Sequence, residues 1–272
     1  NKATSVNTQD KAETLAGKTV LYTGAAGGLG MATTLRMLDA GASVVAIDND
    51  PVKCEELRKA VPEAQAARLI QRDFDLSDTD ALPAKLEALA AETGGFDVVI
   101  NNAAMYPARA FEDYSIEEYR KIQRVNVESH LMCVRAALPG MKERGWGRII
   151  NTASAHSLTA SPFKSAYVAS KHAIAGFTKT IALELAQSGV TANCISPGYV
   201  WTPLVENQIP DTMAARGMTR EEVMNDILLA KQPTKKFVQV EEVGAIAVFL
   251  CSDAAGNVTG ANWSIDGGWT AE

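Results

Sequence analysis

The chain has 272 residues and a formal net charge of −6, with 47% hydrophobic and 21% charged residues. This balance is typical of a folded globular protein and excludes a disordered or collagen-like chain. The sequence has no basic tract, which argues against nucleic acid and an anionic membrane surface as partners. No apolar run approaches the roughly 20 residues that a membrane helix needs.

Seven short apolar runs alternate with longer amphipathic stretches. The runs, which we expect to be strands, span residues 18–24, 43–50, 67–74, 96–103, 147–154, 190–198 and 261–268. Most of the intervening stretches repeat their hydrophobic residues at the helical period. This alternation is typical of βαβ units, so we expect one α/β domain over residues 1–272, with a doubly wound parallel sheet covered on both faces. Its ligand crevice should lie at the carboxyl ends of the strands.

One stretch breaks the alternation. Residues 199–236 contain helical patterns but no convincing strand, between the sixth and seventh expected strands. An insertion of this size beyond a strand end commonly covers a site. We therefore interpret it as a helical substrate lid.

A glycine-rich turn follows the first expected strand. Gly24, Gly28 and Gly30 have the spacing GxxxGxG, and Thr33 stands where a third glycine of GxGxxG would be. Side chains must be absent where backbone approaches a pyrophosphate at the positive end of a helix, so the turn predicts a dinucleotide site. The alternative is a tight strand-to-helix turn that binds nothing.

An acid, Asp48, closes the second expected strand, where a ribose-binding carboxylate is expected. A carboxylate would repel a 2′-phosphate by roughly 4 kcal/mol per unit charge at contact near a protein surface. Residues 25–29 and 49–52 contain no Arg or Lys to offset this repulsion. The sequence thus favours NAD over NADP. The alternative for Asp48 and the neighbouring Asp50 is a solvated loop acid or a helix cap.

Two further strand ends carry candidate cofactor contacts. Asp75 and Leu76 follow the third expected strand, where the carboxylate could accept a hydrogen bond from an adenine amino group or could simply close a turn. Asn102 and Ala103 lie in the run NNAA at the end of the fourth. Backbone among such small residues could pass close to a nucleoside, with a plain turn as the alternative.

Four polar residues form a candidate catalytic group. Tyr167 and Lys171 are spaced i, i+4 at the start of a predicted helix and therefore share a face. A tyrosine with its usual pKa near 10 needs help to act as a base, which the lysine ammonium and the positive nicotinamide of an oxidised cofactor would give. Ser154 ends the fifth strand and could hold the substrate oxygen, and Asn126 could steady a water that relays protons to Lys171. Each residue alone has an ordinary structural interpretation, but their order along the chain argues against coincidence.

These motifs make residues 14–269 strongly resemble the short-chain dehydrogenase/reductases, through TGAAGGLG (23–30), NNAA (101–104), YVASK (167–171) and the turn at 197–198. The resemblance implies a Rossmann-like, three-layer α/β/α fold with a seven-stranded parallel sheet, and a homotetramer. It implies that the catalytic residues are Asn126, Ser154, Tyr167 and Lys171. The cofactor contacts that it implies are Gly24, Gly28, Leu29, Gly30, Asp48, Asp75, Leu76, Asn102, Ala103, Tyr167, Lys171, Pro197, Gly198, Val200 and Thr202.

Within this family, the C-terminal half is similar to bacterial 3-hydroxybutyrate dehydrogenases, notably over residues 153–174 and 197–211. This similarity implies NAD-dependent interconversion of a short 3-hydroxy acid and its keto acid. An entering carboxylate must be met by fixed donors, and the similarity assigns that task to His156, Lys164 and Gln208, beside Ser154 and Tyr167. It places Trp269 near the methyl end of the substrate.

Tyr106 leaves the exact substrate open, because the similar enzymes have a glutamine at this position. The same-chemistry alternative is a dehydrogenase of another small secondary alcohol, such as a hydroxysulfonate, a polyol or an aryl alcohol. An alternative of a different class is a catalytically silent nucleotide-binding regulator, against which the intact Ser, Tyr and Lys set argues.

Cysteine and histidine give no sign of a metal site. The four cysteines (Cys54, Cys133, Cys194, Cys251) and three histidines (His130, His156, His172) lack the spacing of metal ligands. We expect reduced, buried thiols in a cytoplasmic enzyme. Residues 1–13 are polar and lack the hydrophobic region of a signal peptide.

Overall fold

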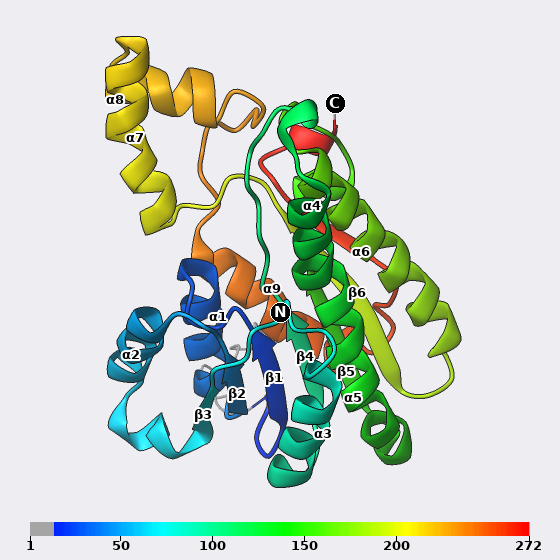
Figure 1. The fold of residues 1–272 in the computed structure, drawn as a ribbon. Coiled ribbons are helices and arrows are strands. Elements are labelled where there is room, and N and C mark those ends of the chain that lie inside the picture. Colours follow the sequence, from blue (N-terminus) through cyan, green and yellow to red (C-terminus); the bar gives the residue numbers. More distant parts are fainter. Residues whose placement is uncertain (1–13, 272) are drawn as a thin grey trace, which may run out of the picture.

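A sheet of seven parallel strands forms the middle layer of the computed structural model, which describes residues 14–271 (Figure 1). The strands are β1 (Thr19–Thr23), β2 (Ser43–Ile47), β3 (Leu69–Arg72), β4 (Val98–Asn101), β5 (Gly147–Thr152), β6 (Val190–Pro197) and β7 (Asn262–Ile265). Their order is β3-β2-β1-β4-β5-β6-β7. Each strand lies inside one of the seven apolar runs, and the predicted Rossmann-like fold is confirmed. The polar segment 1–13 lies outside the described residues.

Helices cover both faces of the sheet. One face carries α1 (Gly28–Asp39), α2 (Pro51–Ala60) and α9 (Val240–Cys251). The other face carries α3 (Leu82–Thr93), α5 (Ser129–Arg144) and α6 (Ser165–Glu184). A shorter helix, α4 (Ile116–Gln123), precedes α5. Successive strand residues supply the two cores in turn, because side chains alternate across a strand. Val20 and Tyr22 of β1 lie in the first core, and Leu21 lies in the second.

The winding of the sheet reverses at β1, which pairs with β2 on one side and with β4 on the other. Thr23 at the end of β1 is in register with Ile47 of β2 and Asn101 of β4. Ligands of open α/β sheets bind at such a reversal, outside the carboxyl ends of the strands. The turns that follow these three strands therefore border the expected crevice.

The segment 199–236 is helical, as predicted. It contains α7 (Pro203–Arg216), α8 (Arg220–Glu222) and a π-helical turn, Val223–Leu228, with an apolar cluster of its own around Ile209. In Figure 1, α7 and α8 project from the body of the sandwich. The two ends of the segment are joined, because Trp201 N donates to Val238 O at 2.8 Å and Val238 N donates to Tyr199 O at 2.9 Å.

Within residues 14–271, no helix is both long enough and apolar enough to cross a membrane.

Candidate active site

The glycine-rich turn between β1 and α1 approaches neighbouring backbone so closely that side chains are excluded. Gly24 has a φ of +66°, and a Cβ there would lie 2.9 Å from the Cα of Ala103. A Cβ at Gly30 would lie 1.9 Å from the carbonyl oxygen of Gly24. The turn leads into the N-terminus of α1, where free N–H groups and the helix dipole favour a phosphate group. This cradle fits the pyrophosphate of a dinucleotide.

Asp48 is fixed beside this turn. Its Oδ2 accepts from Ala26 N at 3.0 Å, and its Oδ1 accepts from Asp50 N at 3.2 Å. Asp50 is the helix cap, because its Oδ1 accepts from the N–H groups of Val52 and Lys53 at the start of α2. The helix-cap alternative therefore applies to Asp50, whereas the Asp48 carboxylate faces the glycine-rich turn, where a ribose hydroxyl could donate to it.

The chain that leaves β6 contacts the same turn. Pro197 is the last residue of β6, and Gly198 and the half-buried Val200 follow it into the segment 199–236. Thr202 is the N-cap of α7. A Cβ at Gly28 would lie 3.3 Å from the Thr202 side chain. The predicted cofactor contacts from β1–α1 and from the β6 end are thus brought together.

Hydrogen bonds hold the end of β4 against the turn. Thr23 Oγ1 accepts from the N–H groups of Asn102 and Ala103 at 3.1 and 3.3 Å, and Asn102 Nδ2 donates to Gly24 O at 3.1 Å. The fully buried His130 of α5 places its Nε2 3.0 Å from Ala103 O. Burial lowers the pKa of His130 to about 3, so the imidazole is neutral. Sequence reasoning considered His130 only as a metal ligand.

Three predicted cofactor residues lie in local protein contacts. Asp75 is exposed, and its Oδ1 accepts from Ser77 N and Oγ at 2.9 and 2.7 Å, which makes it a turn acid. Leu76 is buried in the second core, and Leu29 packs against the first. Their contacts with a cofactor remain predictions.

The structure brings three of the four predicted catalytic residues together. Ser154 follows β5, whereas Tyr167 and Lys171 lie in the first two turns of α6. Lys171 Nζ lies 5.5 Å from the centre of the Tyr167 ring and donates to Thr152 O at 2.7 Å. Ser154 Oγ accepts from His156 N at 3.1 Å. Serine, phenol and ammonium therefore share one site at the carboxyl end of the sheet.

Burial dominates the acid–base properties of this group. It raises the pKa of Tyr167 to about 12, although hydrogen bonding with Ser154 acts in the opposite direction. It lowers the pKa of Lys171 to about 8. Without cofactor, Lys171 therefore does not bring the pKa of the phenol towards neutrality, because loss of solvent costs the tyrosinate more. The lowering of the Tyr167 pKa by Lys171 together with a positive nicotinamide stays a prediction.

Asn126 lies in a π-helical turn, Arg124–Glu128, and is fully buried. Its Oδ1 accepts from Met105 N at 2.7 Å, and its Nδ2 donates to Met105 O at 2.8 Å and Ser170 Oγ at 3.0 Å. Both amide hydrogens are therefore used within the protein. The side chain fixes the loop after β4 onto α6, and its role towards a proton-relaying water stays a prediction.

An aromatic wall stands beside the phenol. The ring centres of Tyr106 and His156 lie 6.2 and 5.9 Å from that of Tyr167. His156 also lies edge-on to Trp269 at 5.1 Å, and Trp269 stacks on Tyr199 at 5.9 Å. The predicted substrate residues Tyr106 and His156 are therefore neighbours of Tyr167, and Trp269 joins them through His156. Tyr199 was not predicted, because an aromatic residue at the start of a helical segment carries no distinguishing pattern.

Lys164 faces this wall, with its Nζ 5.9 Å from the centre of the Tyr199 ring. The side chain is half-buried, and burial lowers its pKa. Burial, with a smaller contribution from Lys164, lowers the pKa of His156 to about 4, so this imidazole is neutral and His156 Nε2 contacts Ser161 Oγ at 2.8 Å. Gln208 is exposed on α7, and within residues 14–271 its side chain forms no hydrogen bond. The structure does not join Gln208 to the cluster.

Gln232 is a buried residue whose role the sequence did not reveal. Its Oε1 accepts from Tyr199 N, and its Nε2 donates to Lys236 O at 2.7 Å. It therefore joins the first and last residues of the segment 199–236. A side chain that acts across 33 positions leaves no local pattern in the sequence.

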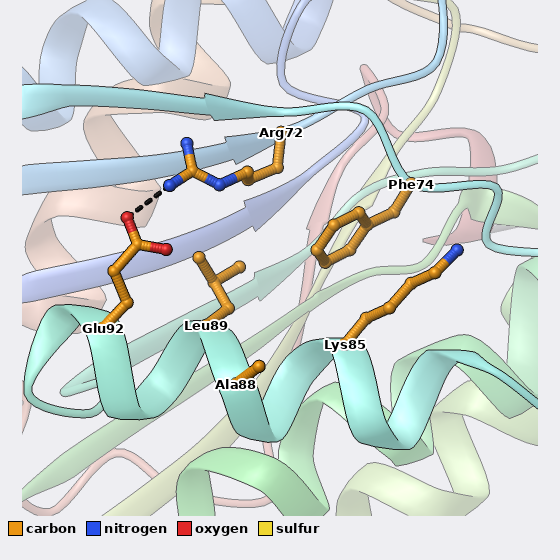
Figure 2. A pocket seen from close by; sticks show the side chains of 6 residues that line it. All are labelled: Arg72, Phe74, Lys85, Ala88, Leu89 and Glu92. Atoms are coloured by element: carbon orange, nitrogen blue, oxygen red, sulfur yellow. Dashed lines mark hydrogen bonds and ion pairs between the residues drawn. The ribbon is translucent and has the colours of Figure 1, made fainter.

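A surface depression at the far edge of the sheet is separate from this site (Figure 2). Arg72 at the end of β3 forms an ion pair with Glu92 of α3 across it, and Lys85 lies over the Phe74 ring at 5.6 Å. The depression is lined by Arg72, Phe74, Lys85, Ala88, Leu89 and Glu92. None of these residues belongs to the catalytic group, which lies around β5 and α6.

A family model described as enoyl-(acyl carrier protein) reductase matches residues 24–270. Two similar relatives are named D-beta-hydroxybutyrate dehydrogenase. The protein of Rhizobium meliloti strain 1021 is 45% identical over 258 residues, which are 94% of this chain and 99% of the relative. The protein of Cupriavidus necator strain H16 is 42% identical over 261 residues, which are 95% of this chain and 100% of the relative.

Solved structures have the same fold. A crystal structure described as a short-chain alcohol dehydrogenase from Sinorhizobium meliloti 1021 has a TM-score of 0.83 and 30% identity, covering 95% of this chain and 98% of that chain. The structure of ElxO with NADP bound also has a TM-score of 0.83, at 24% identity, and covers 94% and 99%. The bound NADP belongs to that neighbour, and likeness of fold does not decide between NAD and NADP for this chain.

Proposed function

The chain belongs to the short-chain dehydrogenase/reductase family of oxidoreductases, and from that premise we propose that it interconverts 3-hydroxybutyrate and acetoacetate with NAD. Two relatives that align with at least 94% of the chain bear the name of a D-beta-hydroxybutyrate dehydrogenase, which supports this substrate. The fixed Asp48 carboxylate beside the glycine-rich turn supports NAD, because a 2′-phosphate would be repelled there. Four unpaired thiols agree with a cytoplasmic setting.

The residues at the crevice fit a nicotinamide dinucleotide. Gly24 and Gly30 leave a cradle that a Cβ would fill, and Asp48 can accept from ribose hydroxyls. When bound, the cofactor would supply the hydride acceptor. Ser154 would hold the substrate oxygen by a hydrogen bond, and the Lys171 ammonium would stabilise the tyrosinate form of Tyr167. The phenolate oxygen of Tyr167 would then take the hydroxyl proton and become a neutral phenol.

One observation supports an acid as the substrate: a half-buried ammonium has no counter-ion within residues 14–271. Lys164 faces the aromatic wall next to Tyr167, and it takes part in none of the ion pairs found in residues 14–271. Burial disfavours an ammonium unless an anion accompanies it. A substrate carboxylate that lies beside Lys164 would supply that anion, with its hydroxyl carbon directed towards Ser154 and Tyr167.

The test replaces this ammonium by an apolar side chain of similar length. In Lys164→Met we expect KM for 3-hydroxybutyrate to rise about tenfold or more, the effect of losing a charge-assisted hydrogen bond, with activity on 2-butanol little changed. Lys179→Met, at an exposed position of α6, the helix that Lys164 precedes, is the matched control. A wild type that oxidises 2-butanol as well as 3-hydroxybutyrate, or a variant with unchanged KM, contradicts the acid substrate.

Tyr106 supports a second candidate function, that of a dehydrogenase for another small secondary alcohol. Its ring stands 6.2 Å from that of Tyr167 and is about half exposed, so it narrows the space in front of the phenol with a bulky donor. A panel of hydroxysulfonates, polyols and aryl alcohols, followed by NADH absorbance, distinguishes the two candidates. Faster turnover of a panel member than of 3-hydroxybutyrate favours the second.

We also propose that the chain forms a homotetramer. Apolar side chains are exposed on two helices and could form subunit contacts: Leu183 on α6 is 80% exposed, and Phe249 on α9, which packs against Trp263 of β7, is 38% exposed. Light scattering coupled to size exclusion measures the mass directly, and a monomer contradicts the proposal.

A further inference from the structure

Two carboxylates, those of Asp48 and Asp50, together occupy the backbone N–H donors at the edge of the crevice that follows β2, where a ribose would bind. Asp48 accepts from Ala26 N of the glycine-rich turn at 3.0 Å and from Asp50 N at 3.2 Å. Asp50 in turn accepts from Val52 N and Lys53 N, both at 3.1 Å. A phosphate group near these N–H groups would have to displace a carboxylate that is already bound to them. The donors of this edge are therefore closed to a second anion.

A cation stands at the same edge and is held by the second carboxylate. Lys53 Nζ lies 3.0 Å from Asp50 Oδ2, and about half of the Lys53 side chain is exposed. The hydrogen bond to Asp50 raises the pKa of Lys53, with smaller contributions from Asp48 and from Tyr106 of the loop after β4. The Lys53 ammonium is therefore influenced by the two acids at this edge and by Tyr106 of the loop after β4.

We propose that Asp50 is a second cofactor-specificity residue, which discriminates against NADP by holding Lys53 in an ion pair. This inference rests on the proposed use of NAD. Asp48 repels a 2′-phosphate directly, as the sequence indicates. Asp50 adds a negative charge one hydrogen bond further along the same edge, and it neutralises the one lysine of this short stretch, 48–53, that could attract the phosphate.

The competing explanation is that Asp50 only caps α2. An asparagine side chain separates the two roles, because Asn caps a helix about as well as Asp. In Asp50→Asn the bonds from Val52 N and Lys53 N can persist, whereas the charge that holds the Lys53 ammonium is gone. A capping residue alone would leave the choice of cofactor unchanged.

The experiment measures dissociation constants for NADH and NADPH by nucleotide fluorescence in the full chain, without any substrate. In Asp50→Asn we expect NADPH to bind about fivefold more tightly than in the wild type, the size of effect that an exposed ion pair can give, and NADH to change by less than about twofold. The gain should shrink when the salt concentration is raised, because the new attraction is solvent-exposed.

Two further variants complete the design. Asp50→Asn combined with Lys53→Ala should lose the gain, because the freed ammonium is absent. Asp78→Asn is the matched control, since Asp78 Oδ1 accepts from Ala81 N at 3.2 Å in a comparable turn before α3. In Asp78→Asn the ratio of the dissociation constants for NADH and NADPH should equal that of the wild type. The thermal midpoint of Asp78→Asn should change by no more than that of Asp50→Asn.

An unchanged ratio in Asp50→Asn overturns the inference, and so does a gain that survives Lys53→Ala. Both results are distinct from failure of the proposed function. A wild type that binds NADPH more tightly than NADH contradicts the proposed use of NAD before any variant is compared.

Discussion

Lys171 offers the sharpest physical test, because its burial should make the stability of the ligand-free protein depend on pH. The side chain is 2% exposed, and burial lowers its pKa from 10.5 to about 8. The unfolded chain therefore still holds the lysine proton between pH 8 and 10.5, where the folded protein has lost it. The free energy of unfolding must then rise with pH across this interval.

The magnitude follows from the size of the pKa change. One pKa unit corresponds to about 1.4 kcal/mol, so the fall from 10.5 to about 8 corresponds to roughly 3 kcal/mol in total. Between pH 7.5 and 9.5 the expected gain is about 2 kcal/mol. Lys171→Met removes the titrating group, so the wild type should gain this amount relative to the variant over that range.

Urea unfolding at several values of pH, without cofactor, measures both proteins. The variant also loses the 2.7 Å hydrogen bond from Lys171 Nζ to Thr152 O. Both the ammonium and the neutral amine can donate this bond, and any difference between them belongs to the titration of Lys171 that the comparison measures. A difference in unfolding free energy between wild type and variant that stays constant from pH 7.5 to 9.5 would refute the lowered pKa of Lys171. A difference that changes in the opposite direction would do so as well.

Three other substitutions have defined outcomes. Tyr167→Phe should lower turnover by at least about 100-fold, since general acid–base assistance is lost, while NADH fluorescence titration gives a nearly unchanged affinity; turnover within about threefold of wild type contradicts this role. Asp48→Ala should weaken NADH binding by about tenfold, as expected for lost hydrogen bonds to a charged group, and should bring the dissociation constants of NADH and NADPH closer together. Fluorescence titration with both nucleotides measures this, and an unchanged ratio of the two constants contradicts the role of Asp48. Gly30→Ala should destabilise the fold by about 2 kcal/mol or more, because its Cβ would meet the Gly24 carbonyl. Gly176→Ala lies inside α6, where the new Cβ would meet no described atom within 4 Å apart from the backbone of its own helix, and it should be neutral or stabilising in the same urea experiment. Equal effects of the two glycine substitutions would contradict the tight turn.

The alternation of apolar runs with helical stretches predicts all seven strands. The five inner strands are buried along most of their length, and burial on both faces favours consecutive apolar residues, whereas the edge strands β3 and β7 are less buried. The spacing of Tyr167 and Lys171 likewise predicts that they share a helix face, which depends only on local geometry. The direction of the Tyr167 pKa could not be predicted, because burial depends on what distant elements place around the phenol. The partners of Asn126 are equally non-local, since Met105 and Ser170 lie 21 and 44 positions away.

The closed base of the segment 199–236 has a consequence for how the family could diversify. Backbone bonds between Tyr199, Trp201 and Val238 bring the two ends of this segment together, and Gln232 fastens them from inside. The segment has its own apolar cluster around Ile209, apart from the two cores that hold the sheet. A piece of chain with adjacent ends and an independent interior can be exchanged as a cassette. Grafting residues 203–236 of a relative, which keeps Val200 of the host and its Thr202 beside the glycine-rich turn, should therefore alter substrate preference while NADH affinity stays that of the host. This is a route by which one nucleotide-binding scaffold acquires new alcohols.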